Sequence, residues 1–159
     1  MAYLIDGNNL LGVLFPGHLK DPENKLKLVR RLIAFGRFKK TRVILVFDGL
    51  ASADVGKMIT PKSRFEIVHP PAGETADAAI MEIVSRQTDV RRFFVVSSDR
   101  GIKTFARLKG AKALGSGDFS TELKQTLKEH KRAKEMEKDA AKLSSLEVNF
   151  WMEVFKKKK

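Results

Sequence analysis

The sequence predicts an α/β domain with a mostly parallel central sheet flanked by helices. Short apolar segments of strand length alternate along the chain with longer amphipathic segments of helix length. The apolar segments are continuous runs, which are typical of parallel strands covered on both faces. With 159 residues, 43% of them hydrophobic, the chain is long enough to bury the core of one such domain.

Five apolar segments are expected to form the strands of this sheet. They are residues 2–5, 42–47, 65–68, 92–98 and 111–114. An aspartate follows three of them, and a Pro-Pro pair lies just after another. Residues of these types commonly end strands, so the segments have plausible boundaries as well as strand-like composition.

Helices are expected between the strands. Residues 24–38 and 74–87 place apolar side chains at helical spacing, and a third helix begins at Asp99 and stops at Gly110. The stretch 49–63 contains Gly, Ser and Pro without a clear period, which predicts a long loop.

We divide the chain into a domain at residues 1–119 and a C-terminal helical extension at 120–159. Up to about Lys142 the extension is highly charged and carries few large apolar side chains. Such a polar helix is typical of a solvated face, and an arm that lies on structured RNA is the alternative.

The end of the extension is expected to be a helix of its own. Ser144 and Glu147 match a capping box ahead of the segment LEVNFWMEVF. The segment also alternates like a strand, but we favour the helix. Its aromatic residues Phe150, Trp151 and Phe155 are expected to pin it to the domain, with stacking on RNA bases as the alternative.

The chain is strongly basic. It has 31 Lys and Arg against 19 Asp and Glu, a net charge of +12 and a pI near 10.0. The excess is spread along the sequence, because residues 1–119 already hold 20 basic and 12 acidic side chains. This charge favours a polyanionic partner, most commonly nucleic acid, while a role in solubility or stability is the alternative.

Composition excludes several classes of site. The chain has no cysteine, which rules out disulfides, thiolate metal sites and cysteine nucleophiles and fits a cytoplasmic location. Its three histidines have no metal-ligand spacing. No apolar run approaches the ~18 residues of a membrane span, and a secretory signal is not recognisable, so no membrane partner is expected.

Four aspartates are expected to meet at one edge of the sheet. Asp6, Asp48 and Asp99 each directly follow a predicted strand, and the ends of parallel strands lie together. Asp77 lies in the first turn of a predicted helix whose N-terminus faces the same edge after a right-handed crossover. Each acid alone could be a helix cap or a turn residue.

Crowded carboxylates raise each other's pKa, so a bound cation would stabilise the cluster. Without cysteine or suitably spaced histidine, oxygen ligands remain, and these favour Mg²⁺ or Mn²⁺. Such an ion activates water for attack on a phosphodiester that the basic residues attract. Asn9 could add an amide oxygen to the ion or a donor to a phosphate, and Gly7 is expected to allow a tight turn that aims Asp6.

The chain resembles a known family in four stretches: IDGNNLL (5–11), VFDG (46–49), ETADAAI (74–80) and VSSDRGI (96–102). Their order and spacing are similar to those of NYN domains, which are PIN-like nucleases, and in particular of the bacterial YacP-like group. The resemblance covers about residues 2–120. It implies a PIN-like Rossmannoid fold, divalent-metal-dependent endoribonuclease activity and a link to translating ribosomes.

The resemblance also implies roles for individual residues. Carried over position by position, the catalytic acids are Asp6, Asp48, Asp77 and Asp99. Of these, the metal ligands are Asp6, Asp77 and Asp99. The residues expected to support the acids without binding the metal are Asn9, Glu74 and Ser98.

Two groups of basic residues are candidates for RNA contact. Arg100 and Lys103 lie one helical turn apart beside Asp99. Lys57 and Lys62 lie in the predicted loop 49–63, with Arg64 directly after it. We expect this loop to form a flap over the RNA, and an exposed loop without such a role is the alternative.

Taken together, these features predict a metal-dependent endoribonuclease that acts on RNA. The alternative is a non-catalytic RNA- or ribosome-binding protein of the same fold, which keeps the acids for folding or weak metal binding. A metal-dependent phosphatase is a third interpretation. Its pattern is incomplete, because Asn8 stands where that chemistry often needs a second aspartate.

Overall fold

The protein is built on a sheet of five parallel strands. The computed structural model describes residues 1–48, 56–57, 59 and 64–157. The strands are β1 (Ala2–Asp6), β2 (Arg42–Val46), β3 (Phe65–Val68), β4 (Phe93–Val96) and β5 (Lys112–Leu114). Their order in the sheet is β3-β2-β1-β4-β5, and every pairing is parallel. The predicted fold class is therefore confirmed, and all five strands lie where the apolar runs predicted them.

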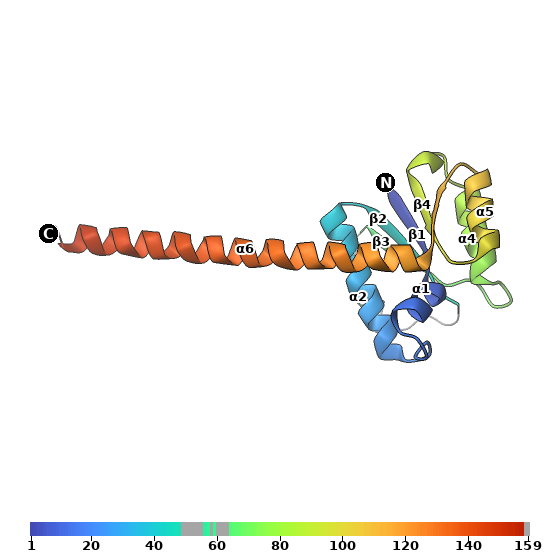
Figure 1. Ribbon diagram of the computed structural model, residues 1–159, viewed down its shortest axis with the longest axis horizontal. Helices are drawn as coiled ribbons and strands as arrows, with labels where there is room; N and C mark the ends of the chain where they lie inside the picture. The colour runs from blue at the N-terminus through green and yellow to red at the C-terminus, as the bar shows by residue number, and fades with distance from the viewer. Residues whose placement is uncertain (49–55, 58, 60–63, 158–159) are drawn as a thin grey trace.

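Helices cover both faces of the sheet (Figure 1). They are α1 (Gly7–Leu14), α2 (Pro22–Lys39), α4 (Ala76–Ser85), α5 (Arg100–Leu108) and α6 (Ser116–Lys157), with a 3-10 turn η1 (Val90–Arg92). The helices α1, α2 and the beginning of α6 pack on one face, and α4 and α5 pack on the other. The sheet is thus buried on both sides, as its continuous apolar strands require.

An aromatic cluster joins the beginning of α6 to the sheet. The ring of Tyr3 in β1 stacks on Phe94 at 4.9 Å between ring centres and lies 5.6 Å from Phe119 of α6. Phe35 of α2 meets both Tyr3 and Phe119 edge-on. The Tyr3 hydroxyl donates to Glu122 over 3.2 Å, and burial, followed by the Glu122 charge, raises the pKa of Tyr3 to about 12. These contacts fix α6 to the domain.

Helix α1 was not predicted, and the expected role of Gly7 was wrong. Gly7 is the first residue of α1 rather than part of a free turn. A Cβ atom there would lie 2.5 Å from the Phe47 ring and 2.8 Å from the Val46 carbonyl oxygen. Only glycine therefore lets α1 start so close to the end of β2.

Helix α6 corrects two expectations about the C-terminal segment. It runs unbroken from Ser116 to Lys157, so Ser144 and Glu147 do not begin a new helix. The side chains of Phe150, Trp151 and Phe155 are 61%, 56% and 64% exposed and do not pin the segment to the domain. The reason is visible in Figure 1, where α6 leaves the domain and extends away from it. No Gly or Pro after Gly117 interrupts it.

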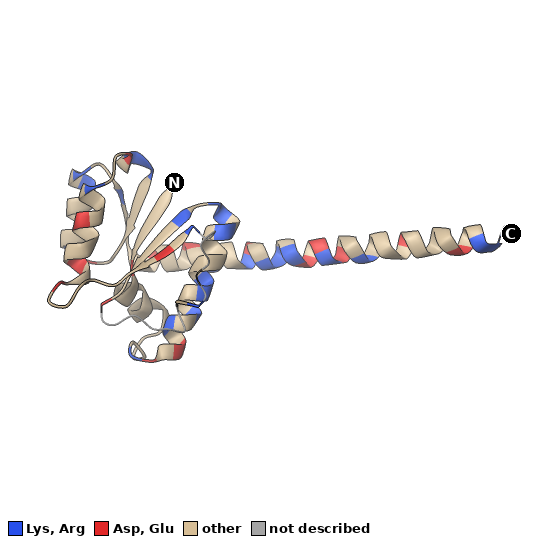
Figure 2. Cartoon of the chain, turned by 180° about the vertical axis from the view of Figure 1, so that it is seen from behind, with Lys and Arg blue, Asp and Glu red and all other residues tan. Residues whose placement is uncertain are grey.

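Charged side chains of both signs lie along the part of α6 that projects from the domain (Figure 2).

Within the described parts of the chain, no helix is both long enough and apolar enough to cross a membrane.

Candidate active site

The four predicted acids lie at the carboxyl edge of the sheet. Asp6 is the last residue of β1, Asp48 follows β2, and Asp99 follows β4 and precedes α5. Asp77 lies in the first turn of α4. Asp6 feels the charges of Asp77 and Asp48, and Asp77 feels those of Asp99 and Asp48. The parallel topology has gathered four acids that lie far apart in the sequence.

Asp6 is the buried member of this group, with 6% of its surface exposed. Its Oδ1 accepts a hydrogen bond from the Asn9 backbone N–H at 3.4 Å, and its Oδ2 accepts one from the Ser97 hydroxyl at 3.1 Å. Burial raises the pKa of Asp6, and the charges of Asp77 and Asp48 raise it further, while the two hydrogen bonds act in the opposite direction. The hydrogen bonds therefore fix the orientation of Asp6 at a buried position that disfavours its charge.

Asp48 and Asp99 also stabilise helix termini. Asp48 Oδ1 accepts from the Ala76 N–H at 2.8 Å, and its Oδ2 accepts from the Asn8 side-chain amide at 3.2 Å. Asp99 is the N-cap of α5, and its Oδ1 accepts from the Ile102 N–H at 2.9 Å. Each of these acids therefore does support the start of a helix, as it could have done alone. These hydrogen bonds also fix the position of both carboxylates at the edge.

Asp77 differs from the other three acids. It is exposed, and the N-cap of α4 is Thr75 rather than Asp77. Partial burial raises the pKa of Asp77, and the charges of Asp99 and Asp48 add to the effect. Repulsion among the acids is therefore felt even at the surface of the site.

Ser97 is a residue of the candidate site that the sequence did not reveal. It is fully buried, its hydroxyl donates to Asp6, and the same oxygen accepts from the Asp99 N–H at 3.1 Å. Its neighbour Ser98, the predicted residue, is exposed and contributes its backbone N–H to Asn9 instead. The pairing of the strands could have revealed Ser97. Because Ile5 pairs with Val96, the residues that follow them, Asp6 and Ser97, lie side by side.

Asn9 connects three segments beneath the acids. Its Oδ1 accepts from the Ser98 N–H at 2.9 Å and from the Ser116 hydroxyl at the start of α6. The amide oxygen that the sequence offered to a metal is therefore used by the fold. Asn9 supports Asp6 through its own backbone N–H, as a positioning residue.

Basic residues that were predicted to contact RNA lie at two different edges of the sheet. Arg100 and Lys103 lie in the first turns of α5 beside Asp99, with Arg100 exposed and Lys103 half-buried. Arg64 directly precedes β3, at the opposite edge of the sheet, and donates to the Lys40 carbonyl at 3.2 Å. The structure therefore brings Arg100 and Lys103 to the acids and places Arg64 away from them.

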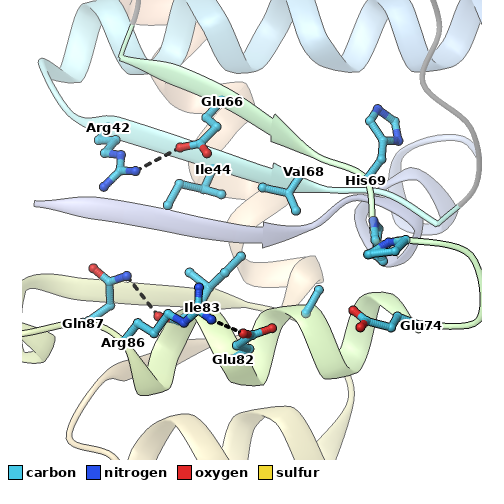
Figure 3. Close-up of a pocket in the computed structure, with 13 residues that line it drawn as sticks. Arg42, Ile44, Glu66, Val68, His69, Glu74, Glu82, Ile83, Arg86 and Gln87 are labelled. Carbon is cyan, nitrogen blue, oxygen red and sulfur yellow. Dashed lines mark hydrogen bonds and ion pairs between the residues drawn. The ribbon is translucent and has the colours of Figure 1, made fainter.

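The predicted flap lies largely outside the described residues, and Lys62 lies outside them altogether. Lys57 is described and exposed. Glu74 precedes α4 and lines a groove of about 440 Å³ between β3 and α4 (Figure 3). Two ion pairs, Arg42 with Glu66 and Arg86 with Glu82, also face this groove.

The donors at the edge fit a hard divalent cation. All four acidic side chains offer oxygen, which Mg²⁺ and Mn²⁺ prefer. Among the residues that the structure describes, no three Asp, Glu or His side chains are close enough together to hold an ion as a closed set. Mg²⁺ commonly uses one or two carboxylates and keeps several waters. The arrangement therefore fits an ion bound largely through water, rather than one enclosed by three direct ligands.

Comparison with known proteins places the chain in a family. The model of the YacP-like NYN domain matches residues 3–157. The crystal structure of Rae1 (YacP) from Bacillus subtilis is similar at a TM-score of 0.68 and 21% identity, over 98% of this chain and 91% of that one. Its W164L mutant is similar at a TM-score of 0.65 and 19% identity, over 83% of this chain and 79% of that one. The comparison with curated proteins gives no match. Since the family model spans nearly the whole sequence, this chain belongs to the YacP-like NYN domain family, a family of nuclease-type domains.

Proposed function

We propose that this protein is a divalent-metal-dependent endoribonuclease whose active site is the carboxyl edge of the sheet. One observation carries the proposal. Four aspartates from separate segments meet at this edge, and their mutual repulsion raises the pKa of Asp6 and Asp77 beyond the effect of burial. In a chain with a net charge of +12, four of the 19 acidic side chains lie together where a cation would stabilise them.

The residues that would hold the ion, in part through water molecules, are Asp6, Asp77 and Asp99. When bound, Mg²⁺ or Mn²⁺ lowers the pKa of a water molecule and neutralises charge that develops on the phosphodiester oxygens. Asp48 completes the acidic edge, where the Asn8 amide and the start of α4 hold it.

The protein's own residues orient the site and the substrate. Ser97 and the Asn9 backbone fix both oxygens of Asp6, so this carboxylate needs no rearrangement before the reaction. Arg100 and Lys103 lie next to Asp99 and can bind phosphate oxygens of the RNA. Together these groups position a phosphodiester across the acidic edge.

Cleavage of total RNA with mapped ends tests the proposal. In Asp99→Asn the amide oxygen still caps α5, so the fold is retained while the charge is lost. We expect Mn²⁺-dependent cleavage to fall by more than about 100-fold, the scale of removing a group that supports a metal site. Asp89→Asn is the matched control, because Asp89 precedes η1 and β4 at the opposite edge. Retained cleavage in Asp99→Asn, or cleavage that EDTA leaves intact, would overturn the proposal.

The second candidate is a non-catalytic RNA- or ribosome-binding protein. The observation that favours it is α6, which carries Lys and Arg far beyond the domain and the acidic edge (Figure 2). This function predicts RNA affinity that falls steeply with salt and is indifferent to EDTA, with no cleavage in any metal. The same cleavage assay therefore separates the two functions.

A further inference from the structure

A hollow lined by two lysines borders the acidic edge near the start of α2. A hollow of about 410 Å³ is lined by Asn8, Leu19, Lys20 and Lys25. Asn8 belongs to the active-site edge, since its side-chain amide donates to Asp48 Oδ2 at 3.2 Å. The hollow therefore opens directly beside the acids, at the point where α2 begins.

Lys25 is held in place by an aromatic ring. Its ammonium lies 5.4 Å from the centre of the Phe47 ring, a cation–π contact, and Phe47 immediately precedes Asp48. The contact ties the position of this charge to the residue next to Asp48. Lys25 is half-buried, whereas Lys20 beside it is exposed.

These two lysines have charge to offer a ligand. Within the described residues, neither lies in an ion pair, whereas their neighbour Lys27 pairs with Glu23 at 3.8 Å. Two ammonium groups that face one hollow repel each other unless an anion lies between them. A phosphate group has the charge and the acceptor oxygens to bind there.

The hollow lies opposite the cations already assigned to RNA. Lys20 and Lys25 belong to the layer of α1 and α2, whereas Arg100 and Lys103 belong to α5 on the other face of the sheet (Figure 1). The acids lie between them, at the ends of the central strands. An RNA strand that crosses the edge would meet cations before and after the acids.

We propose that Lys20 and Lys25 form a phosphate subsite for single-stranded RNA, and that it binds a phosphodiester neighbouring the one at the acids. This inference rests on the proposed endoribonuclease function and deepens it. The path of the strand runs from this hollow across Asp48 and Asp6 towards Asp99 and Arg100. The subsite contributes to RNA binding and not to the chemical step.

The test is the salt dependence of RNA binding. The probe is a mixed-sequence single-stranded oligoribonucleotide, and its binding is measured in EDTA, where the proposed metal-dependent enzyme does not cleave it. For the double variant Lys20→Gln/Lys25→Gln, the slope of log Kd against log salt should flatten by about 0.7, because the subsite neutralises one phosphate and each neutralised phosphate of a single strand accounts for about 0.7. With Mn²⁺ present, KM for RNA cleavage should rise while kcat is retained.

The matched control is Arg37→Gln/Lys39→Gln, which removes two positive charges at the far end of α2, the helix that carries Lys25. Both residues are exposed in the last turn of α2, and Lys39 lies about 21 Å from Lys25 along the helix axis. This control should keep the wild-type slope. Equal slopes in the two double variants would overturn the subsite.

Two single variants separate an effect on RNA binding from an effect on folding. Lys20→Gln alone changes an exposed residue outside the helices and should give a smaller change of slope than the double variant, at an unchanged Tm. Lys25→Arg should keep the wild-type slope, since arginine keeps both the charge and the contact with Phe47. If the wild type cuts RNA while the lysine variants bind RNA like the control, the inference about the subsite is wrong and the proposed function stands. If the wild type neither binds nor cuts RNA, the proposed function fails with it.

Discussion

Asp6 shows most clearly how the site opposes the stability of the fold. Burial and two neighbouring acids raise its pKa, so the folded protein binds its proton more tightly than the unfolded chain does. The charged form of Asp6 therefore destabilises the protein, and this destabilisation grows as the pH rises from the ordinary aspartate pKa of 3.8 through the raised value. It is fully present once the pH lies above the raised pKa.

We predict that Asp6→Asn raises Tm by a few degrees at pH 7 in EDTA. Asparagine can still accept from the Asn9 N–H and can donate to the Ser97 hydroxyl, so both hydrogen bonds are kept without the charge. The gain should shrink as the pH falls towards 3.8 and below, because Asp6 is then protonated in the wild type as well. Thermal denaturation across this pH range measures it, and a gain that is constant with pH would contradict the assignment.

Gly7 has a role in packing. We predict that Gly7→Ala lowers the stability by about 1–3 kcal/mol, because the new methyl group would overlap the Phe47 ring and a backbone oxygen. Gly117→Ala in α6 is the control, since nothing lies within 4 Å of a Cβ at Gly117 and alanine favours a helix. Urea denaturation should show a loss of stability for the first variant and none for the second.

At the residue scale, the sequence predicted the acids well and their partners poorly. Asp6, Asp48 and Asp99 could be placed because each follows an apolar run, and parallel topology makes such positions neighbours. Ser97 could not be placed in the same way, because its importance arises from pairing with β1 across 91 residues. The role of such a buried polar residue can be inferred only when the residue beside it on the neighbouring strand is known.

At the scale of secondary structure, the strands and the longer helices follow from hydrophobic pattern. The strand Phe65–Val68 has the bounds that its sequence predicted. Helix α1 was missed because Gly-Asn-Asn after Asp6 has the composition of a turn. It forms because Asp6 caps it and because Leu10 and Leu11 are fully buried in the core. Tertiary packing has overridden local propensity there.

Helix α5 separates the structural role of Asp99 from its proposed catalytic role. We predict that Asp99→Ala lowers the stability by about 1 kcal/mol, because the cap of α5 is lost, whereas Asp99→Asn keeps the cap. Both variants should lose RNA cleavage. Urea denaturation and the cleavage assay on the same samples check this. Equal stability of the two variants would show that the cap does not matter.

At the scale of the whole molecule, α6 has two parts with different roles. Its first turns bury Phe119, Leu123 and Thr126 against the domain, and the ring of His130 lies 5.4 Å from that of Phe38. Beyond these residues the helix is largely exposed. The sequence predicted a charged helical extension but not its continuity, because a capping-box pattern starts a helix only where the preceding chain is not already helical.

Truncation tests this division of α6. We predict that a chain ending at Arg132 keeps the wild-type Tm, because none of the removed residues belongs to the packed core. A chain ending at Asp118 should fail to fold, since removing the buried Phe119 and Leu123 takes away roughly 5–10 kcal/mol of packing. A marked fall in Tm for the chain ending at Arg132 would show that the projecting part stabilises the domain.

The proposed nuclease needs all four acids at one edge, and Asp77 tests this most directly. Asp77 is exposed and is not the N-cap of its helix, so replacing it leaves the fold intact. The measurement is Mn²⁺-dependent cleavage of RNA by Asp77→Asn, beside the wild type and Asp89→Asn. We expect cleavage by the wild type and by Asp89→Asn, and none by Asp77→Asn, whose Tm should not fall below that of the wild type. Undiminished cleavage by Asp77→Asn would show that the acidic edge is not the active site we propose.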